Sequence, residues 1–293
     1  MHLANQVMNK HISKITVVIT GHKVLTYSQY IKYLIHSLTG SLDSCKFIVY
    51  YDKSGFKDTD NLDQIVDIFK LYNISNYEVK FAQGGLHTMF YHLLTDVKTP
   101  YVLFLEHDWI FNKLPNWQNI VKAMDNNNFV KCIYFKKSRN VAYNIPWSND
   151  VFGGDIQNND VKLETDPRVI ECDLISCAYW CNNPFICTLK QMKVWSTIIH
   201  DKSYKKLIAS GIVCGYGSAC VEGPIIRAFK RDLDSSPWSD IRDKWGVYLY
   251  GDVGMEPIIG HTDGSRRYVR ERYSPSEQIG TDWVNKNKHQ LKY

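Results

Sequence analysis

The stretch YVLFLEHDWIF, residues 101–111, determines how the rest of the sequence is interpreted. A run of apolar residues leads directly into Glu106, His107 and Asp108, and a tryptophan with two further apolar residues follows. An apolar run of this kind, without alternation, is typical of a strand that is buried on both faces of a parallel sheet. Ligands of such sheets bind beyond the carboxyl ends of the strands. The two carboxylates therefore mark a candidate functional edge.

The residues before this stretch alternate between two patterns. Short β-branched apolar runs, typical of strands, occur at 15–23, 46–55, 77–85 and 101–109. Between them, apolar residues recur at helical spacing over 26–40, 61–72 and 86–97. This alternation predicts an α/β fold of the Rossmann type, a mostly parallel sheet flanked by helices and connected by right-handed crossovers.

The second half of the chain is less regular. Helices are predicted at 116–127 and 188–199 and at the end of 216–233, and strands at 130–138, 175–186 and 245–251. The 175–186 strand is expected to break at its Asn-Asn-Pro. The long polar segment 139–167 is rich in Asn, Asp, Gly and Pro, and loops of that length are usually functional. Because no linker or internal repeat is visible, residues 1–293 are interpreted as a single domain.

Composition narrows the class of protein. The chain has 293 residues, 44% hydrophobic and 22% charged, which is typical of a globular protein with a sizeable core. A net charge of +5 is too small to indicate a nucleic-acid partner. No apolar run reaches the ~18 residues of a membrane span, and the first residues lack the apolar region of a secretory signal. We therefore expect a cytoplasmic protein whose eight cysteines are free, mostly buried thiols.

Three carboxylates follow predicted strands and are expected on one edge of the sheet: Asp52, Glu106 and Asp108. Glu106 and Asp108 are two positions apart, so extended backbone would direct both side chains to the same side. A divalent cation would relieve their repulsion, because Mg²⁺ and Mn²⁺ accept oxygen ligands. The alternative is that these residues cap a strand and pair with surface lysine or arginine. His107, between them, is expected to face the interior.

The order of these features resembles the GT-A class of nucleotide-sugar glycosyltransferases, in which an apolar strand is followed by an acidic DxD motif. The resemblance covers most of the chain and is strongest over 15–112. CVEGPIIRAF at 220–229 and GHTDGSRR at 260–267 are similar to compact bacterial and large-DNA-virus members. The resemblance implies that residues 1–112 form a nucleotide-sugar-binding half and residues 113–293 an acceptor-binding, catalytic half. The resemblance also implies a UDP- or GDP-linked donor, Mn²⁺ or Mg²⁺, and a glycan acceptor. We expect the long 139–167 segment to recognise the acceptor.

The resemblance further implies roles for individual residues. Nucleotide contacts are implied for Thr20, His22, Asp52, Gly84, Gly85 and Glu106. Metal contacts are implied for Asp108, Glu106 and His261. Plain alternatives stay open: a turn at Asp52 and at the glycine pair, and a structural role for His261. The arginines at 266–272 could neutralise a diphosphate, contact a membrane or form a solvated face.

An inverting transferase needs a carboxylate base for the acceptor hydroxyl. The resemblance places this base at Glu222, at the start of a predicted helix. A carboxylate there can equally act as a cap that interacts with the helix dipole. Relatives often carry two adjacent acids at this point, whereas Gly223 follows here, and Asp173 and Glu171 are reserves. In a retaining enzyme Glu222 would not need to be a base.

Three other functions compete with this one. A nucleotidyltransferase could use the same carboxylates with Mg²⁺, but no Gly-rich signature with Lys or Arg lies near the first strand. A non-catalytic nucleotide- or sugar-binding module would bind without metal dependence. A dinucleotide oxidoreductase is disfavoured, because TGHKVL stands where a GxGxxG motif would be. The sequence therefore predicts a metal-dependent glycosyltransferase that transfers a hexosyl or pentosyl group with inversion.

Overall fold

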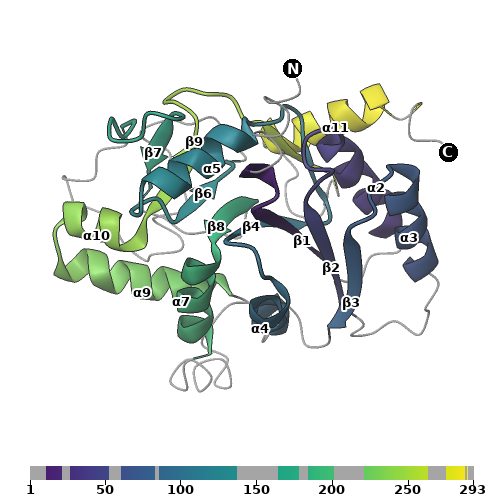
Figure 1. The fold of residues 1–293 in the computed structure, drawn as a ribbon. Helices are drawn as coiled ribbons and strands as arrows, with labels where there is room; N and C mark the ends of the chain where they lie inside the picture. The colour runs from purple at the N-terminus through teal and green to yellow at the C-terminus, as the bar shows by residue number, and fades with distance from the viewer. Residues whose placement is uncertain are drawn as a thin grey trace, which may run out of the picture.

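The computed structural model of the chain is built around one mixed β-sheet (Figure 1). It describes residues 11–21, 27–52, 61–82, 86–136, 164–177, 184–200, 221–262, 275–287 and 289. Within these residues the sheet has eight strands. In spatial order they are β3 (Tyr77–Ala82), β2 (Lys46–Asp52), β1 (Ile15–Gly21), β4 (Tyr101–Glu106), β8 (Phe185–Thr188), β6 (Cys132–Tyr134), β9 (Val247–Tyr250) and β7 (Leu174–Ser176).

The half of the sheet built from the amino-terminal part of the chain is parallel, as predicted. β2 pairs in parallel with β3 and β1, and β1 pairs in parallel with β4. Strand order reverses at β1, because the chain moves outward through β2 and β3 and then places β4 on the other side of β1. The other half is mixed. β8 runs antiparallel to β4 and β6, and β7 runs antiparallel to β9, while β6 and β9 are parallel.

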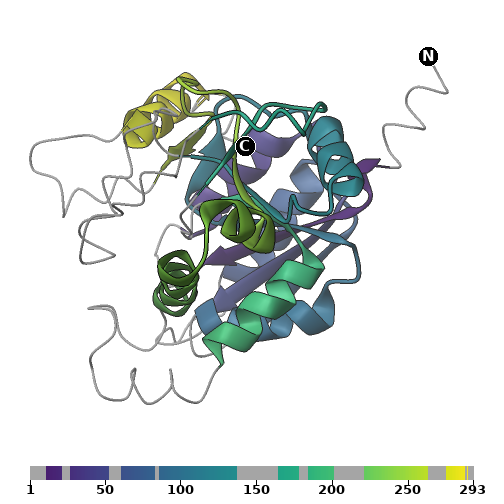
Figure 2. The ribbon, with the colours of Figure 1, turned by 90° about the vertical axis from the view of Figure 1, so that its left-hand side faces the viewer.

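Helices cover both faces of the sheet (Figures 1 and 2). One face packs against α2 (Tyr27–Leu38), α3 (Asn61–Leu71) and α5 (Trp117–Asn126). The other face packs against α4 (Leu86–Asp96), α7 (Leu189–Ile199), α9 (Glu222–Ser235) and α10 (Trp238–Trp245). In β1, Val17 and Ile19 face the first layer and Val18 faces the second. Burial on both faces explains why these strands are continuous apolar runs.

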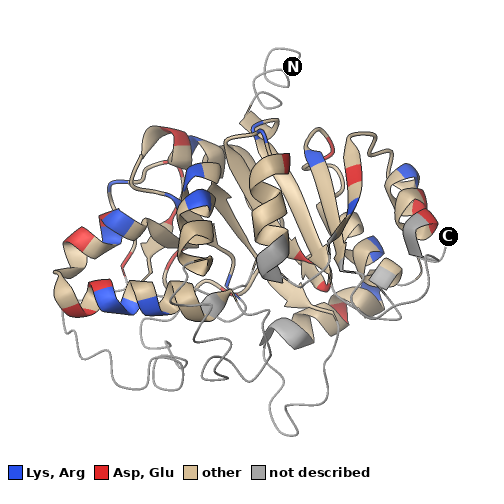
Figure 3. Ribbon diagram, turned by 90° about the horizontal axis from the view of Figure 1, so that it is seen from below, with Lys and Arg blue, Asp and Glu red and all other residues tan. Residues whose placement is uncertain are grey.

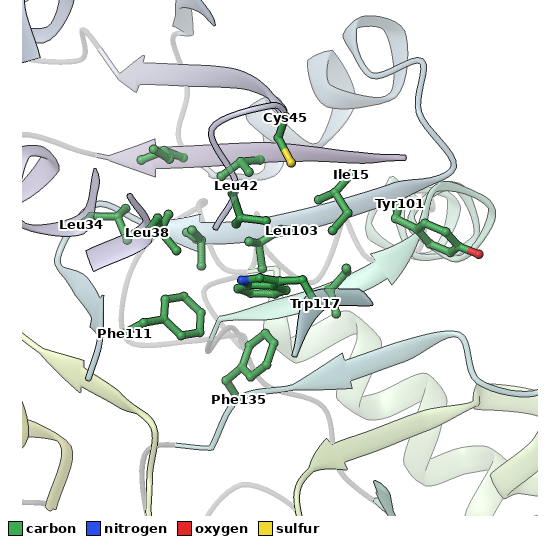
Figure 4. Close-up of a cluster of buried hydrophobic side chains, with 14 of the residues drawn as sticks. Ile15, Leu34, Leu38, Leu42, Cys45, Tyr101, Leu103, Phe111, Trp117 and Phe135 are labelled. Atoms are coloured by element: carbon green, nitrogen blue, oxygen red, sulfur yellow. The ribbon is translucent and has the colours of Figure 1, made fainter. Parts of the chain in front are cut away.

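The core on the α2 side contains a cluster of aromatic rings (Figure 4). Phe111, Trp117 and Phe135 contact one another edge to face, with ring centroids 5.3–5.6 Å apart. Trp117 opens α5, and Asn116 caps this helix by accepting a hydrogen bond from the backbone N–H of Asn119 at 3.1 Å. The cap fixes where the helix begins, so the first apolar residue of α5 enters the core.

The described residues agree with what composition predicts for the interior and the surface. Free thiols are confirmed for the described cysteines, most of them buried: Cys45, Cys132, Cys172, Cys177 and Cys187. Charged residues of both signs lie mainly on the helices (Figure 3). Of the helices that the structure describes, none is both long enough and apolar enough to cross a membrane.

A second, two-stranded sheet corrects the expectation for 101–109. β4 ends at Glu106, the chain turns at His107 and Asp108, and a new strand, β5 (Trp109–Phe111), begins. β5 pairs antiparallel with β10 (Ile259–His261), and α11 (Pro275–Asn287) packs against β10. The apolar run gives no sign of the turn, because both strands are buried and periodicity cannot separate two buried strands.

Two other elements differ from the expectation. The predicted 175–186 strand is two strands, β7 and β8, which are separated in the sheet by β6 and β9. Helix α10 was not predicted. It has eight residues, and only Trp238, Ile241 and Trp245 are buried. A helix of two turns offers too few apolar positions for helical periodicity to be recognised.

Gly246 ends α10 in the left-handed conformation, with φ of 60°. A Cβ at this position would lie 2.8 Å from Lys131 Cγ and closer still to the carbonyl oxygen of Phe129. We expect Gly246→Ala to lower the free energy of unfolding by at least about 2 kcal/mol, because backbone strain adds to the clash. Gly254, with φ of 86° and open space around it, is the control. Gly254→Ala should cost only ~1 kcal/mol from strain. Urea titration measures the free energy of unfolding of both variants. An equal decrease in Gly246→Ala and Gly254→Ala would contradict the predicted clash.

Candidate functional site

Glu106 lies where the order of the strands reverses. β1 and β4 are neighbours that end side by side, with Thr20 in register with Glu106. β2 and β3 lie to one side of this point and β8 to the other. In open α/β sheets the crevice for ligands forms at such a reversal, beyond the carboxyl ends of the strands. The topology therefore places the acidic stretch at the expected ligand-binding edge.

The turn at His107 and Asp108 changes how the carboxylates are arranged. The backbone N–H of His107 donates to the Thr20 carbonyl at 2.9 Å, which extends the pairing of β1 with β4. The His107 ring is buried and lies edge to face against Tyr30 of α2, with centroids 5.8 Å apart, so it faces the interior as expected. Because the chain turns between Glu106 and Asp108, the prediction that one extended strand directs both carboxylates to the same side is wrong.

Strand β10 holds His261 against Asp108. The antiparallel pairing puts His261 opposite Trp109, the residue that follows Asp108. Thr262 donates two hydrogen bonds to the Asp108 carbonyl, from its backbone N–H at 2.7 Å and from its hydroxyl at 2.8 Å. His261 Nε2 lies 3.2 Å from Asp108 Oδ2. The structure thus joins two of the three residues that were assigned to a metal.

Asp108 is buried, yet only one of its carboxylate oxygens is bonded. Its side chain is 9% exposed, and Oδ1 has no hydrogen-bond partner among the described residues. Burial by itself raises the pKa of Asp108, but the hydrogen bond and charge of His261, with the charge of His107, outweigh it and lower the pKa to about 2. Asp108 is therefore ionised at neutral pH and presents an unmet acceptor.

The Asp108–His261 pair fits a divalent cation that also binds phosphate. Carboxylate oxygen and neutral imidazole nitrogen are both ligands of such ions, so His261 would bind the ion in its deprotonated form. Within the described residues, no group of three or more His, Cys, Asp or Glu side chains could hold an ion, so Glu106 does not complete a set with the pair. Mg²⁺ is usually held by one or two carboxylates, with substrate phosphates and water in the other positions. One carboxylate with an unmet oxygen and one imidazole are consistent with that kind of site.

Only part of the predicted nucleotide contacts can be placed. Thr20 is 2% exposed, and its hydroxyl donates a long hydrogen bond, 3.4 Å, to the Leu105 carbonyl, so its side chain packs within the sheet. Asp52 ends β2 as predicted, in register with Ala82. Strand spacing puts the ends of β2 and β4, with β1 between them, about 10 Å apart. The side chain of Asp52 lies outside the described residues, as do the following residues: His22, Gly84 and Gly85.

The carboxylate predicted as the base opens a helix, as expected. Glu222 is the first residue of α9, and its side chain lies outside the described residues. The reserve acids Glu171 and Asp173 directly precede β7, the outermost strand, and β8, β6 and β9 lie between β7 and β4. Four strand spacings amount to about 19 Å, so both acids lie well away from the end of β4.

Several residues that shape the site were not found by sequence reasoning. Thr262 directly follows the candidate ligand His261, and this adjacency was the one available signal. Tyr30 gave no signal, because its contact with His107 joins a helix to a turn. Trp109 lies edge to face with His261, with centroids 4.7 Å apart, and supports the imidazole rather than a sugar. Tryptophan rings can stack on sugars, but Trp109, Trp238 and Trp245 are buried, and Trp147 lies outside the described residues.

Comparison with known proteins yields likeness of shape only. No protein-family model matches the sequence, and neither does any curated protein. The S. aureus TarS structure of residues 1–349 is 13% identical over 94% of this chain and 72% of that one, with a TM-score of 0.46. The galactosyltransferase LgtC, solved with donor and acceptor sugar analogues, is 10% identical over 92% and 95%, with a TM-score of 0.47. A UDP-glucose pyrophosphorylase complexed with UDP-glucose is 8% identical over 94% and 99%, with a TM-score of 0.41. Scores this low assign neither a family nor an activity.

Proposed function

We propose that this protein is a metal-dependent glycosyltransferase. It moves a hexosyl or pentosyl group from a UDP- or GDP-linked donor to a hydroxyl group of a glycan acceptor. The observation that carries the proposal is the ionised, buried Asp108, which has one unmet oxygen and His261 beside it where strand order reverses. The resemblance of the 101–109 stretch to the acidic motif of sugar-nucleotide enzymes supports a nucleoside diphosphate as the ligand.

We assign each described residue near the donor a separate role. A bound Mn²⁺ or Mg²⁺ would supply electrostatic stabilisation of the diphosphate leaving group. Asp108 and His261 would hold this ion, and the two hydrogen bonds from Thr262 keep the Asp108 turn in place. Glu106, partly exposed at the end of β4, would face the ribose. The hydrogen bonds that hold the β4–β5 turn would preorganise these groups, so little would have to move as charge develops on the leaving group.

Glu222 would accept the proton of the attacking hydroxyl. General-base catalysis contributes roughly 10²–10⁴-fold, so we expect Glu222→Gln to lower kcat by that factor. Donor affinity should not change, because the base contacts the acceptor. Asp234→Asn, an exposed carboxylate on the same helix, is the control and should leave kcat unchanged. Steady-state kinetics measures kcat and the dependence of the rate on donor concentration for each variant. The donor is the one that the thermal-shift test described next identifies. An unchanged kcat in Glu222→Gln would show that Glu222 is not the general base.

The proposal is tested first by binding. Thermal shifts of the whole protein are measured with UDP, GDP and their sugar conjugates, each with Mn²⁺ and with EDTA. A ligand at ~100 times its Kd that binds only the folded state stabilises by roughly 2.7 kcal/mol, which is readily detected. We expect stabilisation that requires Mn²⁺. The absence of a shift with every nucleotide would overturn the proposal.

The products distinguish a glycosyltransferase from a nucleotidyltransferase on the same site. A glycosyltransferase releases a nucleoside diphosphate from the sugar nucleotide. A nucleotidyltransferase joins a sugar phosphate to the nucleotidyl group of a nucleoside triphosphate and releases pyrophosphate. Binding without turnover, insensitive to EDTA, would instead indicate the non-catalytic module.

A further inference from the structure

Helix α11 approaches strand β10 more closely than side chains would allow. A Cβ built on Gly260 of β10 would lie 2.6 Å from the backbone nitrogen of Gly280 and 2.9 Å from its Cα. A Cβ built on Gly280 would lie 2.6 Å from the carbonyl carbon of His261 and closer still to its oxygen. Close-packed interiors do not accommodate such overlaps without movement. Two facing glycines therefore let the helix rest directly on the backbone that carries His261.

The same face of α11, about one turn further along, is anchored to helix α2, beside which it lies in Figure 1. Trp283 contacts Tyr33 of α2 edge to face, with centroids 6.1 Å apart, and both pack with Ile110 of β5 in one buried cluster. Tyr30, also on α2, lies against His107. Helix α11 thus packs against both α2 and β10, and both of these neighbours contact the turn that contains Asp108.

We infer that Gly280 is a positioning residue for the Asp108–His261 pair. β10 pairs with β5 over three residues and is joined to the Asp108 carbonyl through Thr262. Helix α11 rests directly on the backbone of His261, so it also contributes to where His261 lies. The distance at issue is the 3.2 Å between His261 Nε2 and Asp108 Oδ2. Gly280 acts through the backbone of His261 and touches no ligand. The consequence for ligand affinity rests on the function proposed above, whereas the consequence for the pair does not.

Gly280→Ala has two opposing effects, a gain in helix propensity and a steric clash with β10. Intrinsic helix propensity favours alanine over glycine by ~1 kcal/mol within a helix. The added methyl group would overlap backbone atoms of His261, which cannot rotate away as a flexible side chain can. Either α11 or β10 must shift, and a hydrogen bond already at 3.2 Å weakens steeply with further separation. Positioning therefore predicts loss of the contact even where the helix itself is strengthened.

The first test needs no ligand. A double-mutant cycle with Asp108→Ala and His261→Ala, read by urea unfolding, measures the coupling between the two side chains. The cycle is repeated with Gly280→Ala, and with Thr281→Ala, an exposed neighbour on α11, as the control. We expect the coupling to fall to within error of zero in the Gly280→Ala protein and to persist in the control. Persistence of the coupling in Gly280→Ala would overturn the inference.

A milder variant keeps the test informative if Gly280→Ala does not fold. Trp283→Phe retains an aromatic ring against Tyr33 but shrinks the anchor of α11, and it should reduce the coupling in part. Gly254→Ala lowers stability without touching this region. Coupling that is preserved in Gly254→Ala but reduced in Trp283→Phe therefore separates positioning from general destabilisation. Coupling unchanged in Trp283→Phe would contradict the inference.

The second test concerns the ligand. Calorimetric titration with Mn²⁺ and UDP, well below the melting temperature, should show at least a tenfold higher Kd for Gly280→Ala than for Thr281→Ala, or 1.4 kcal/mol. Equal affinity in the two variants would overturn the link to binding. If the wild type binds neither UDP nor GDP in the presence of Mn²⁺, the proposed function fails, and the double-mutant cycle still decides the role of Gly280.

Discussion

Asp108→Asn is expected to abolish metal-dependent nucleotide binding while leaving the fold intact. Asparagine has nearly the same shape and can still accept a hydrogen bond from His261, so the protein should fold. The free energy of unfolding should fall, because the charge interactions with His261 and His107 that lower the pKa of Asp108 are lost. The negative charge is lost. Mutation of outer-shell partners of metal ligands costs 10–100-fold in affinity, so loss of a direct ligand should raise the Kd for UDP with Mn²⁺ by at least about 100-fold. Because transition-state charge is also affected, kcat/KM should fall by roughly a thousandfold.

Asp125→Asn is the matched control for this prediction. Asp125 is a carboxylate whose side chain is 26% exposed, bonded to Lys14 at 2.7 Å and to the Tyr101 hydroxyl at 2.6 Å. Tyr101 begins strand β4, so Asp125 lies at the opposite end of the strand that leads to Asp108. The control should change stability slightly and nucleotide affinity not at all. A similar loss of affinity in both variants, or unchanged affinity in Asp108→Asn, would contradict the assignment of Asp108.

Asp166→Ala is expected to lower the free energy of unfolding by about 3 kcal/mol. Asp166 is 3% exposed and accepts hydrogen bonds from Arg168 Nη2 and from the Tyr248 hydroxyl at 3.0 Å. Arg168 also reaches Asp243 and lies 4.0 Å over the Phe129 ring. Removing the carboxylate leaves a buried hydroxyl without its acceptor and an arginine with one partner fewer, and both losses are costly. Urea titration at neutral pH measures the change.

The pH dependence of this network has a definite sign. Burial by itself raises the pKa of Asp166, but the hydrogen bonds from Arg168 and Tyr248 outweigh it and hold the pKa below its usual value. A lowered native pKa gives stability that is fully present above the unfolded pKa of about 3.9 and is lost as pH falls through the native value. The stability difference between wild type and Asp166→Ala should therefore be constant near neutral pH and shrink below about pH 4.

Asp243→Ala separates the buried carboxylate from the exposed one. The Asp243 side chain is 43% exposed, so its ion pair with Arg168 should contribute less than about 1 kcal/mol. A loss as large as that of Asp166→Ala would show that burial does not govern this network. A difference between wild type and Asp166→Ala that grows on acidification would contradict the sign of the pKa shift.

The parallel half of the fold could be predicted from the sequence because each of its elements is long and buried. β1, β2 and β4 have six or seven residues that are apolar on both faces, and amphipathic helices separate them. Those local patterns determine the fold class and place Glu106 at the carboxyl edge. They also place Glu222 at the start of a helix, which the structure confirms for the backbone. Local sequence was sufficient wherever one element was long enough to show its period.

Tertiary structure alone decided how the candidate site is assembled. The turn at His107 and Asp108 is hidden in a continuous apolar run, and β5 and β10 have three residues each, too few to show a period. Their pairing brings Thr262 onto Asp108 across 154 positions of sequence. The glycine contact between α11 and β10 also depends on packing rather than on local preference. Contacts between residues so distant in sequence depend on the free energy of the whole packed chain. Local sequence could therefore identify Asp108 and His261 as separate candidates, and only the fold shows that they lie together.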